Sequence, residues 1–335
     1  MTTRQALLQA LARAQGRPLS GEALAGRLGV SRAAVCKAAR ALRAQGYQID
    51  AASGRGYQLL PGPDPLTREA LLAACAAEGW APAMAEVWPE LPSTNLRARQ
   101  LALAGAPDGA LVLAGGQSQG RGRLGRRFES PAGRGLYMTL LLRPRLPAAE
   151  AACLTGRAAV AVCRAVSRLC RTELAIKWVN DLFLQGKKVG GILTEAVTDL
   201  EGGLVEFAAL GIGLNLTALP DEFGPELAGL AGSLFPGGPA PCGRCALAAA
   251  VCAEFAALGP GFGYLEEYRA RSLVLGRYLT VLGQGEPFAA RAVEIDRLGR
   301  LVVELSGGGR RTLGSGEVQI RPAALGFGPA AGGPP

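Results

Sequence analysis

The sequence predicts an α+β protein of several domains: an N-terminal winged helix-turn-helix, a central mixed α/β domain and a small C-terminal β-barrel. Three observations predict this. Residues 4–60 show three short helical patterns followed by two strand patterns, residues 109–216 alternate strands with a long helix, and from about residue 276 only short strands remain. The proline-rich segment PGPDP (61–65) marks the first boundary. We expect domains at 1–61, 62–274 and 275–323, followed by a disordered tail at 324–335.

Composition narrows the class of protein. The chain has 335 residues, 49% of them hydrophobic, which is enough to build the cores of two or three domains. No apolar run reaches the ~18 residues that span a bilayer, and the N-terminus lacks the layout of a signal peptide, so we expect a soluble cytoplasmic protein. The net charge of +9 indicates either a polyanionic partner, such as nucleic acid or a phosphorylated ligand, or a generally basic surface.

The chain contains no histidine, which excludes every mechanism that uses a histidine base, nucleophile or metal ligand. Of its eight cysteines only Cys242 and Cys245 have the spacing of metal ligands, and without a second pair they do not predict a zinc site. We therefore expect no protein-held metal. Lysine is also scarce, yet Lys177, Lys187 and Lys188 all fall in the segment KWVNDLFLQGKK, which indicates positions where a compact ammonium group is needed.

Residues 4–60 predict the winged helix-turn-helix in detail. Helical patterns at 4–16, 20–29 and 31–46 end at glycines, and serines stand at the N-cap positions of the second and third. The third helix has an apolar stripe made of Val35, Ala38, Ala39 and Leu42. YQIDAASGRGYQLL then predicts two short strands, the wing. A basic helix with small residues suits the major groove of DNA, although the same fold also serves protein contacts. The candidate DNA-contacting residues are Ser31, Arg32, Lys37, Arg40, Arg43 and Arg55.

The central domain is predicted from alternating strand and helix patterns. Strands are expected at GALVLAGG (109–116), LYMTLLLRP (136–144), VGGILTEAV (189–197) and LVEFAALGIGLNL (204–216), and a long helix at 149–170. The last two strands are expected to pair as an antiparallel hairpin. Near the C-terminus YLTVLG, FAARAVEID and LVVELSG predict the strands of the small barrel, with a turn at RLGR.

The segment GQSQGRGRLGRRFESPAGRG (116–135) is rich in glycine and arginine and lies between two of these strands. Gly120, Gly122 and Gly125 match the dinucleotide fingerprint, but that fingerprint must open a helix, and Pro131 breaks any helix here. A nucleic-acid-binding tract would repeat its units and lie at a terminus. A single glycine-rich loop inside a compact domain is typical of a binding site, and its arginines suit phosphates or a carboxylate, so we favour an anion-binding cradle.

This loop and the lysine-rich segment, with PSTN before them and GIGLN after them, resemble the biotin protein ligase family in order and spacing. With its N-terminal winged helix the chain is similar, over residues 5–322, to the bifunctional class that is also the biotin operon repressor. The resemblance implies a central domain of the class II synthetase-like type and an SH3-like C-terminal barrel. It also implies an enzyme of the biotin–[biotin carboxyl-carrier protein] ligase type.

Such enzymes form biotinyl-5′-AMP from biotin and ATP, with Mg²⁺, and then transfer biotin to a lysine of the biotin carboxyl carrier protein of acetyl-CoA carboxylase. Biotin's carboxylate is already ionised at neutral pH, so the first step needs positive charge and orientation rather than a base. The resemblance further implies operator DNA as a partner and a homodimer promoted by biotinyl-AMP.

The resemblance also implies a set of site residues. The expected catalytic residues are Arg123, Lys177, Asp181 and Lys188. Biotin is expected to bind Ser93, Thr94, Asn95, Gln117, Arg121, Gly122, Arg123 and Lys188. ATP is expected to bind Arg123, Arg126, Phe128, Lys177, Asn180 and Asn215. Asp181 either receives the acceptor lysine or balances the surrounding positive charge, and Lys187 is expected to face solvent.

Three positions depart from the family's usual pattern. Phe128 stands where tryptophan is usual, Val179 where proline is usual, and Gly135 where asparagine is common. Phe128 keeps an aromatic platform for adenine, and we place no ligand contact at Gly135.

Three alternatives stay open on the sequence alone. A sensor that only regulates transcription needs the winged helix but not the set Lys177, Asn180, Asp181 and Lys188. A lipoate ligase has a related fold but usually carries a His-Asp pair, which this histidine-free chain lacks. A ligase whose winged helix has lost its operator is the third.

Overall fold

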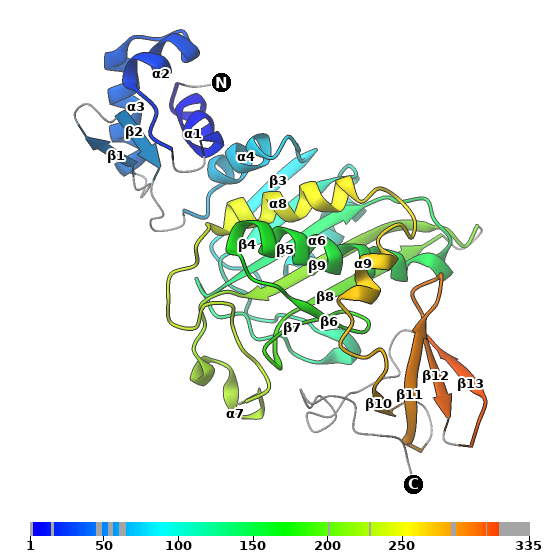
Figure 1. Cartoon of the computed structure of the whole chain (residues 1–335). Helices are drawn as coiled ribbons and strands as arrows, with labels where there is room; N and C mark the ends of the chain where they lie inside the picture. Colours follow the sequence, from blue (N-terminus) through cyan, green and yellow to red (C-terminus); the bar gives the residue numbers. More distant parts are fainter. Residues whose placement is uncertain are drawn as a thin grey trace.

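The structure, a computed structural model, describes residues 3–14, 17–44, 49–52, 56–59, 65–199, 202–227, 229–282, 286–305 and 307–314. They form a helical N-terminal unit, a large unit around a seven-stranded sheet, and a four-stranded C-terminal sheet (Figure 1). This confirms the α+β architecture. None of the described helices is long and apolar enough to cross a membrane. Most of the linker at 61–65 and the whole tail at 324–335 lie outside the described residues.

The N-terminal unit has the order expected of a winged helix-turn-helix. Its helices are α1 (Thr3–Arg13), α2 (Gly21–Leu28) and α3 (Arg32–Ala44), followed by the antiparallel hairpin of β1 (Ile49–Ala52) and β2 (Gly56–Leu59). Ser20 and Ser31 cap α2 and α3, as predicted, by accepting backbone N–H groups at 3.0 Å and 3.2 Å. The whole predicted stripe of α3 is buried. The helix ends at 16 and 46 and the turn at 53–55 lie outside the described residues.

The central sheet has the strand order β3-β4-β5-β9-β8-β7-β6. Its strands are β3 (Met84–Trp88), β4 (Ala110–Ala114), β5 (Gly135–Leu142), β6 (Ala175–Lys177), β7 (Asp181–Leu184), β8 (Lys187–Thr198) and β9 (Val205–Asn215). Only the pair β3–β4 is parallel among the pairs of this sheet. The predicted hairpin of β8 and β9 is confirmed, from Gly190 opposite Leu214 to Thr198 opposite Val205.

Helices cover the two faces of this sheet unequally. The helices are α4 (Arg68–Ala77), α5 (Thr94–Leu103), α6 (Ala152–Cys170), α7 (Gly224–Leu227), α8 (Arg244–Ala257) and α9 (Leu265–Ala270). Leu111 and Leu113 of β4 join the main core with α6 and α8, whereas Ala110 and Val112 join a smaller core with α5. Because side chains alternate along a strand, α5 lies on the face opposite to α6 and α8. The α6–α8 pair is visible across the sheet in Figure 1.

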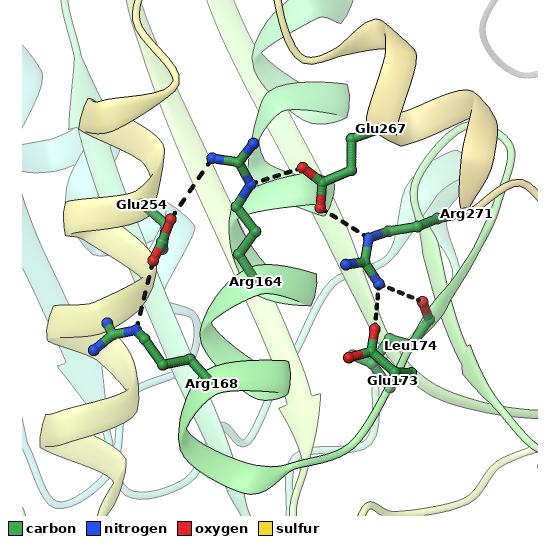
Figure 2. A network of polar contacts seen from close by, with 7 residues as sticks. All are labelled: Arg164, Arg168, Glu173, Leu174, Glu254, Glu267 and Arg271. Carbon is green, nitrogen blue, oxygen red and sulfur yellow. Dashed lines mark hydrogen bonds and ion pairs between the residues drawn. The ribbon is translucent and has the colours of Figure 1, made fainter.

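Ion pairs bind the outer helices to one another. Figure 2 shows Arg164 and Arg168 of α6 reaching Glu254 of α8, at 3.8 Å and 3.6 Å. Arg164 also reaches Glu267 of α9 at 2.7 Å, and Glu267 in turn pairs with Arg271 at 3.0 Å. Glu254 and Glu267 are therefore each shared by two arginines. The network therefore fixes α6, α8 and α9 as one layer behind the sheet.

The C-terminal sheet has the order β10-β11-β12-β13, all antiparallel. Its strands are β10 (Tyr278–Val281), β11 (Phe288–Ile295), β12 (Leu301–Leu305) and β13 (Arg310–Leu313). The predicted strands are confirmed, but the closed SH3-like barrel is not: within the described residues the sheet is open. A meander of four short strands closes only if its edge strands pair or a further strand joins them, and neither occurs in the part of the chain that the structure describes.

Candidate functional site

One row of paired residues crosses the central sheet and gathers several of the predicted site residues. In register from β5 to β6, the row is Tyr137, Gly213, Gly191, Asp181 and Lys177. Two positions before Gly213 on β9, Gly211 pairs with Thr139. Gly211 and Gly213 face the same side as Ala209, which is the side covered by α5. Three neighbouring positions on this face of β8 and β9 thus have no side chain, and we call Gly191, Gly211 and Gly213 the glycine floor.

The start of α5 lies directly on this floor. PSTN is an N-cap followed by the first helical turn rather than an isolated turn: the buried Ser93 hydroxyl accepts the Leu96 N–H at 3.4 Å. Asn95 is buried, and its Nδ2 donates to the Leu193 carbonyl at 3.1 Å and to Glu195 Oε2 at 2.8 Å. A methyl group on Gly211 would lie 2.1 Å from Asn95 Oδ1. Asn95 therefore needs glycine beneath it.

Threonine and glutamine side chains join α5 to the arginine–glycine loop. The Thr139 hydroxyl lies 2.8 Å from the Thr94 hydroxyl and 2.7 Å from Asn95 Oδ1. Gln117 Oε1 accepts the Thr94 N–H at 2.8 Å, and Gln117 Nε2 donates to the Ser130 hydroxyl at 2.9 Å. The predicted residues Thr94, Asn95 and Gln117 thus form one continuous polar network.

The arginine–glycine loop, between β4 and β5, is folded back on itself as an irregular hairpin. Its backbone bonds include Gln117 to Ser130, Phe128 to Gly120 and Gly122 to Arg126, at 3.1, 3.0 and 2.7 Å. A methyl group on Gly120 would lie 2.3 Å from the Phe128 carbonyl oxygen, so the two arms approach too closely for any side chain there. Phe128 in turn lies over Gly213, whose added methyl group would be 2.5 Å from its ring. No α-helix follows Gly125, in agreement with the rejection of the dinucleotide fingerprint.

The loop arginines divide between two directions. Arg123 Nη1 donates to Asn180 Oδ1 at 3.0 Å, across the floor, and burial lowers the pKa of Arg123 while Asp181 partly offsets this. Arg121 lies 3.9 Å from Glu195 Oε1. An open hollow of about 290 Å³ lies on the loop itself. It is lined by Ser118, Gln119, Gly120, Arg121, Gly125, Arg126 and Arg127. Arg126 lines this hollow and also acts electrostatically on Lys177 of β6.

The segment KWVND forms the turn between β6 and β7 and is held from outside the central sheet. Trp178 Nε1 donates to the Gly299 carbonyl in the C-terminal sheet at 2.8 Å. The buried Tyr268 hydroxyl of α9 donates to the Val179 carbonyl at 3.0 Å, and the Trp178–Val179 peptide bond is cis. Asn180 Nδ2 donates to the Ile192 carbonyl at 2.9 Å. Both flanks of the turn are fixed, so Lys177 and Asn180 keep their places beside the floor.

Lys188 and Asp181 form an ion pair at the edge of the floor, with Nζ and Oδ1 2.6 Å apart. Both lie within ordinary contact of a methyl group built on Gly191. Burial lowers the pKa of Lys177, Asp181 raises it, and the positive charges of Lys188 and Arg126 lower it. Asp181 is therefore the carboxylate that offsets the positive charges of Lys177 and Lys188 at this edge of the floor. Lys187 is exposed, as predicted.

Asn215, at the end of β9, carries an unsatisfied acceptor. Its Nδ2 donates to the Gly232 carbonyl at 3.0 Å, and its backbone carbonyl accepts the Leu234 N–H at 3.0 Å. Among the described residues, Asn215 Oδ1 and Arg157 Nε are the buried side-chain polar atoms without a hydrogen-bond partner. An unpaired buried acceptor costs about 1–3 kcal/mol, so a donor on a bound ligand would relieve it.

Sequence reasoning missed two residues that the network depends on, Glu195 and Thr139. Both lie on the floor's side of the sheet, Glu195 four positions after Gly191 and Thr139 two after Tyr137. The period of two along each strand would have found them once the glycines were taken as the site. Of the predicted DNA-contacting residues, Arg32, Lys37 and Arg40 are exposed, and the Ser31 hydroxyl caps α3. The side chain of Arg43 and all of Arg55 lie outside the described residues.

Comparison with known protein families finds one match in the central unit and one in the N-terminal unit. Residues 87–215 match the biotin/lipoate A/B protein ligase family, and residues 3–58 match an HTH domain. The chain is 36% identical over 234 residues to the bifunctional ligase/repressor BirA of Bacillus subtilis, covering 70% of this chain and 71% of that protein. The chain belongs to the biotin/lipoate A/B protein ligase family.

Other members of the biotin/lipoate A/B protein ligase family agree. The chain is 31% identical over 245 residues to the biotin–[acetyl-CoA-carboxylase] ligase of Mycobacterium tuberculosis, covering 69% of this chain and 86% of that one. Among solved structures, the biotin protein ligase from Aquifex aeolicus in complex with biotin and ATP is 24% identical and has a TM-score of 0.59. That match covers 71% of this chain and 98% of the other, and it shows that the two share a fold.

The charges of Asp181 and Lys188 lead to a prediction about the pKa of Lys177. Replacing Asp181 (Asp181→Asn) removes a negative charge and is expected to lower the pKa of Lys177, whereas Lys188→Ala removes a positive charge and is expected to raise it. Because the chain has so few lysines, ¹³C labelling at lysine Cε lets the Lys177 signal be followed through a pH titration. Shifts of the same sign in both variants would contradict the described arrangement.

Proposed function

We propose that this chain is an ATP-dependent biotin protein ligase that forms biotinyl-5′-AMP and then transfers biotin to a lysine of a biotin carboxyl carrier protein. One observation carries the proposal. Two polar clusters, Thr94–Asn95–Gln117 and Arg123–Asn180 with Lys188–Asp181, lie beside one glycine floor, on which Asn95 and Phe128 rest. The first cluster offers neutral hydrogen-bonding groups, and the second offers positive charge. Together they fit a molecule with a polar ring at one end and a carboxylate at the other.

In the ligand-binding part of this proposal, Ser93, Thr94, Asn95 and Gln117 hold the ring of biotin. Arg121, Gly122, Arg123 and Lys188 surround the junction between its carboxylate and the phosphate. Arg126, Lys177 and Asn180 serve the phosphates of ATP, and Phe128 encloses the adenylate. The unpaired Asn215 Oδ1 accepts a hydrogen bond from the nucleotide, which supports a donor-bearing ligand at this place.

Magnesium fits this site only together with the nucleotide. The described residues contain no group of three Cys, Asp or Glu placed to hold a metal ion. Near the proposed phosphate site the chain offers Asp181 and Asn180, and Mg²⁺ commonly binds through one carboxylate and substrate phosphates. When bound, Mg²⁺ would neutralise phosphate charge.

The first step needs two anions held in line. The biotin carboxylate attacks the α-phosphorus of ATP, a P–O bond to the β-phosphate breaks, and pyrophosphate leaves. Lys188, Arg123 and Lys177 lower the repulsion between the reacting anions by placing positive charge around them. Lys188 is held by Asp181 before the ligand arrives, so its charge is already positioned.

In the second step the acceptor lysine attacks the biotinyl carbonyl, and AMP leaves with the bonding electrons. We propose that Lys188 turns to the ligand and frees Asp181 to take the proton of the incoming ammonium group. The ion pair of Asp181 with Lys188 supports the charge-balancing role considered from the sequence. In this scheme both roles belong to the one carboxylate at different stages.

Adenylation is tested by biotin-dependent exchange of labelled pyrophosphate into ATP. The wild-type chain is expected to show exchange that requires biotin, and Lys188→Ala is expected to reduce it by on the order of 100-fold or more, because a cation that meets the developing charge is lost. Lys187→Ala, one residue away and exposed, is the matched control and is expected to retain exchange. Biotin binding without any exchange would make the site a sensor pocket instead.

The glycine floor allows the two ends of the ligand to be tested separately. Gly211→Ala would displace Asn95 and is expected to raise KM for biotin, whereas Gly213→Ala would displace Phe128 and is expected to raise KM for ATP. Steady-state kinetics with one substrate varied at a time measure each effect, on the order of tenfold. The two variants control for each other because they lie on the same face of β9. Equal effects on both KM values would contradict this division.

We propose a second function, repression of biotin genes by DNA binding as a ligand-promoted dimer. Three observations support it: the winged helix-turn-helix, the exposed cations Arg32, Lys37 and Arg40 on α3, and the similarity to ligase/repressor proteins. One module supplies roughly four or five cations if Arg43 and Arg55 are included. Such a module binds weakly at physiological salt, so a dimer is required for tight binding.

The DNA-binding face is tested through its salt dependence on a duplex of random sequence. For one module the slope of log K against log salt is expected to be about −4, and the double replacement Arg32→Ala, Arg40→Ala is expected to make it shallower by about two. Fluorescence anisotropy at several salt concentrations measures both slopes. Arg310→Ala, an exposed arginine of the C-terminal sheet, is the control. An unchanged slope in the double variant would exclude α3 as the DNA-binding element.

A further inference from the structure

Two cysteines far apart in the sequence meet on the α6–α8 side of the sheet, away from the candidate site. Cys170 is the last residue of α6, and Cys242 lies two residues before α8 begins. Their Sγ atoms are 3.4 Å apart. A disulfide needs a separation of ~2.05 Å, so an approach of about 1.4 Å through side-chain rotation would join them. This contact is independent of the proposed ligase function.

The C-x-x-C spacing would pair Cys242 with Cys245, but in the structure Cys242 contacts Cys170. Cys242 and Cys245 have C-x-x-C spacing, yet Cys245 Sγ is directed to the carbonyl oxygens of Pro65 and Thr67, at 3.7 Å and 4.0 Å. Cys242 Sγ instead contacts Cys170, 72 residues earlier. The partner of Cys242 is therefore set by the packing of α6 against the segment before α8, not by the motif.

This pair also differs from the other cysteines in its chemistry. A hydrogen bond with the Cys242 thiol lowers the pKa of Cys170, with burial opposing the effect. Burial raises the pKa of the other cysteines for which a shift is resolved, Cys75, Cys153, Cys163 and Cys252. Cys242 is only partly buried, whereas Cys170 is buried, so Cys242 is the more exposed partner. Thiolate character together with access is what makes a cysteine reactive.

We propose that Cys170 and Cys242 are a modification site that forms a reversible disulfide on reaction with a hydroperoxide. In this scheme the Cys170 thiolate takes the proton of the Cys242 thiol across the contact, and the Cys242 sulfur then attacks the terminal peroxide oxygen and becomes a sulfenic acid as the O–O bond breaks and an alcohol or water leaves. Cys170 then attacks the Cys242 sulfur, the S–S bond forms, and water leaves. Overall two thiols are oxidised and one peroxide is reduced. Thiol reductants reverse the reaction.

The disulfide would close a covalent loop around half of the candidate site. Residues 170–242 include β6, β7, β8 and β9, and therefore Lys177, Asp181, Lys188 and Asn215. A cross-link that closes so long a loop restricts the unfolded chain more than the folded one. Oxidation is therefore expected to raise the melting temperature, by on the order of 5 °C.

The test uses the full-length reduced chain treated with hydrogen peroxide. Thiol titration under denaturing conditions is expected to fall from eight cysteines to six, and peptide mapping is expected to find Cys170 linked to Cys242. The melting temperature should rise on oxidation and return with dithiothreitol. Eight remaining thiols, or a link between Cys242 and Cys245, would overturn the proposal, and neither result depends on a variant.

Two variants refine the assignment. In Cys245→Ser the link is expected to form as in the wild type, because Cys245 takes no part in it. In Cys170→Ala the sulfenic acid of Cys242 has no partner and is expected to be captured by dimedone. Loss of the link in Cys245→Ser, or dimedone capture at a buried cysteine such as Cys163 instead of Cys242, would count against the assignment. The ligase assay plays no part in this test, so its outcome leaves the proposed function unaffected.

Discussion

The site depends on the absence of side chains at three positions of one sheet face. Gly191, Gly211 and Gly213 lie side by side on β8 and β9, and the spaces that their missing Cβ atoms leave receive Asn95 from α5 and Phe128 from the loop. The opposite face of the same strands is filled by large apolar residues packed on α6 and α8. One face is therefore rigid because it is fully packed, and the other can admit polar groups because it is bare.

Positively charged side chains outnumber acidic side chains in the site. Arg123 rests on the amide of Asn180, Lys188 on Asp181, and Arg121 near Glu195. Each of these three cations thus has a polar or acidic partner, so none of them is left as an unpaired charge in the site. This arrangement stabilises negative charge without any histidine, which is consistent with chemistry that starts from an already ionised carboxylate.

Much of the architecture was predictable because its signals are local. Strands β5, β8 and β9 and the caps at Ser20 and Ser31 follow from periodicity and capping patterns. The helical setting of Ser93, the contact of Glu195 with both Asn95 and Arg121, and the pairing of Cys170 with Cys242 were not predictable. These contacts depend on which distant segments of the chain pack together, and a local sequence pattern does not indicate this. The barrel was predicted from strand content, yet closure depends on pairing between strands distant in sequence.

The two hydrogen bonds that reach the turn at Trp178–Asn180 limit how this chain can be divided. Gly299 lies in the turn between β11 and β12 and Tyr268 lies in α9, so a turn that carries proposed catalytic residues is held by residues about 90 and 120 positions further along the chain. A split version of the protein cut near residue 275 would leave the Trp178 indole without its acceptor. Replacing the C-terminal sheet by that of a relative would require the backbone at Gly299 to be reproduced closely. The smallest unit that can be exchanged as a module therefore runs from the central sheet through β12.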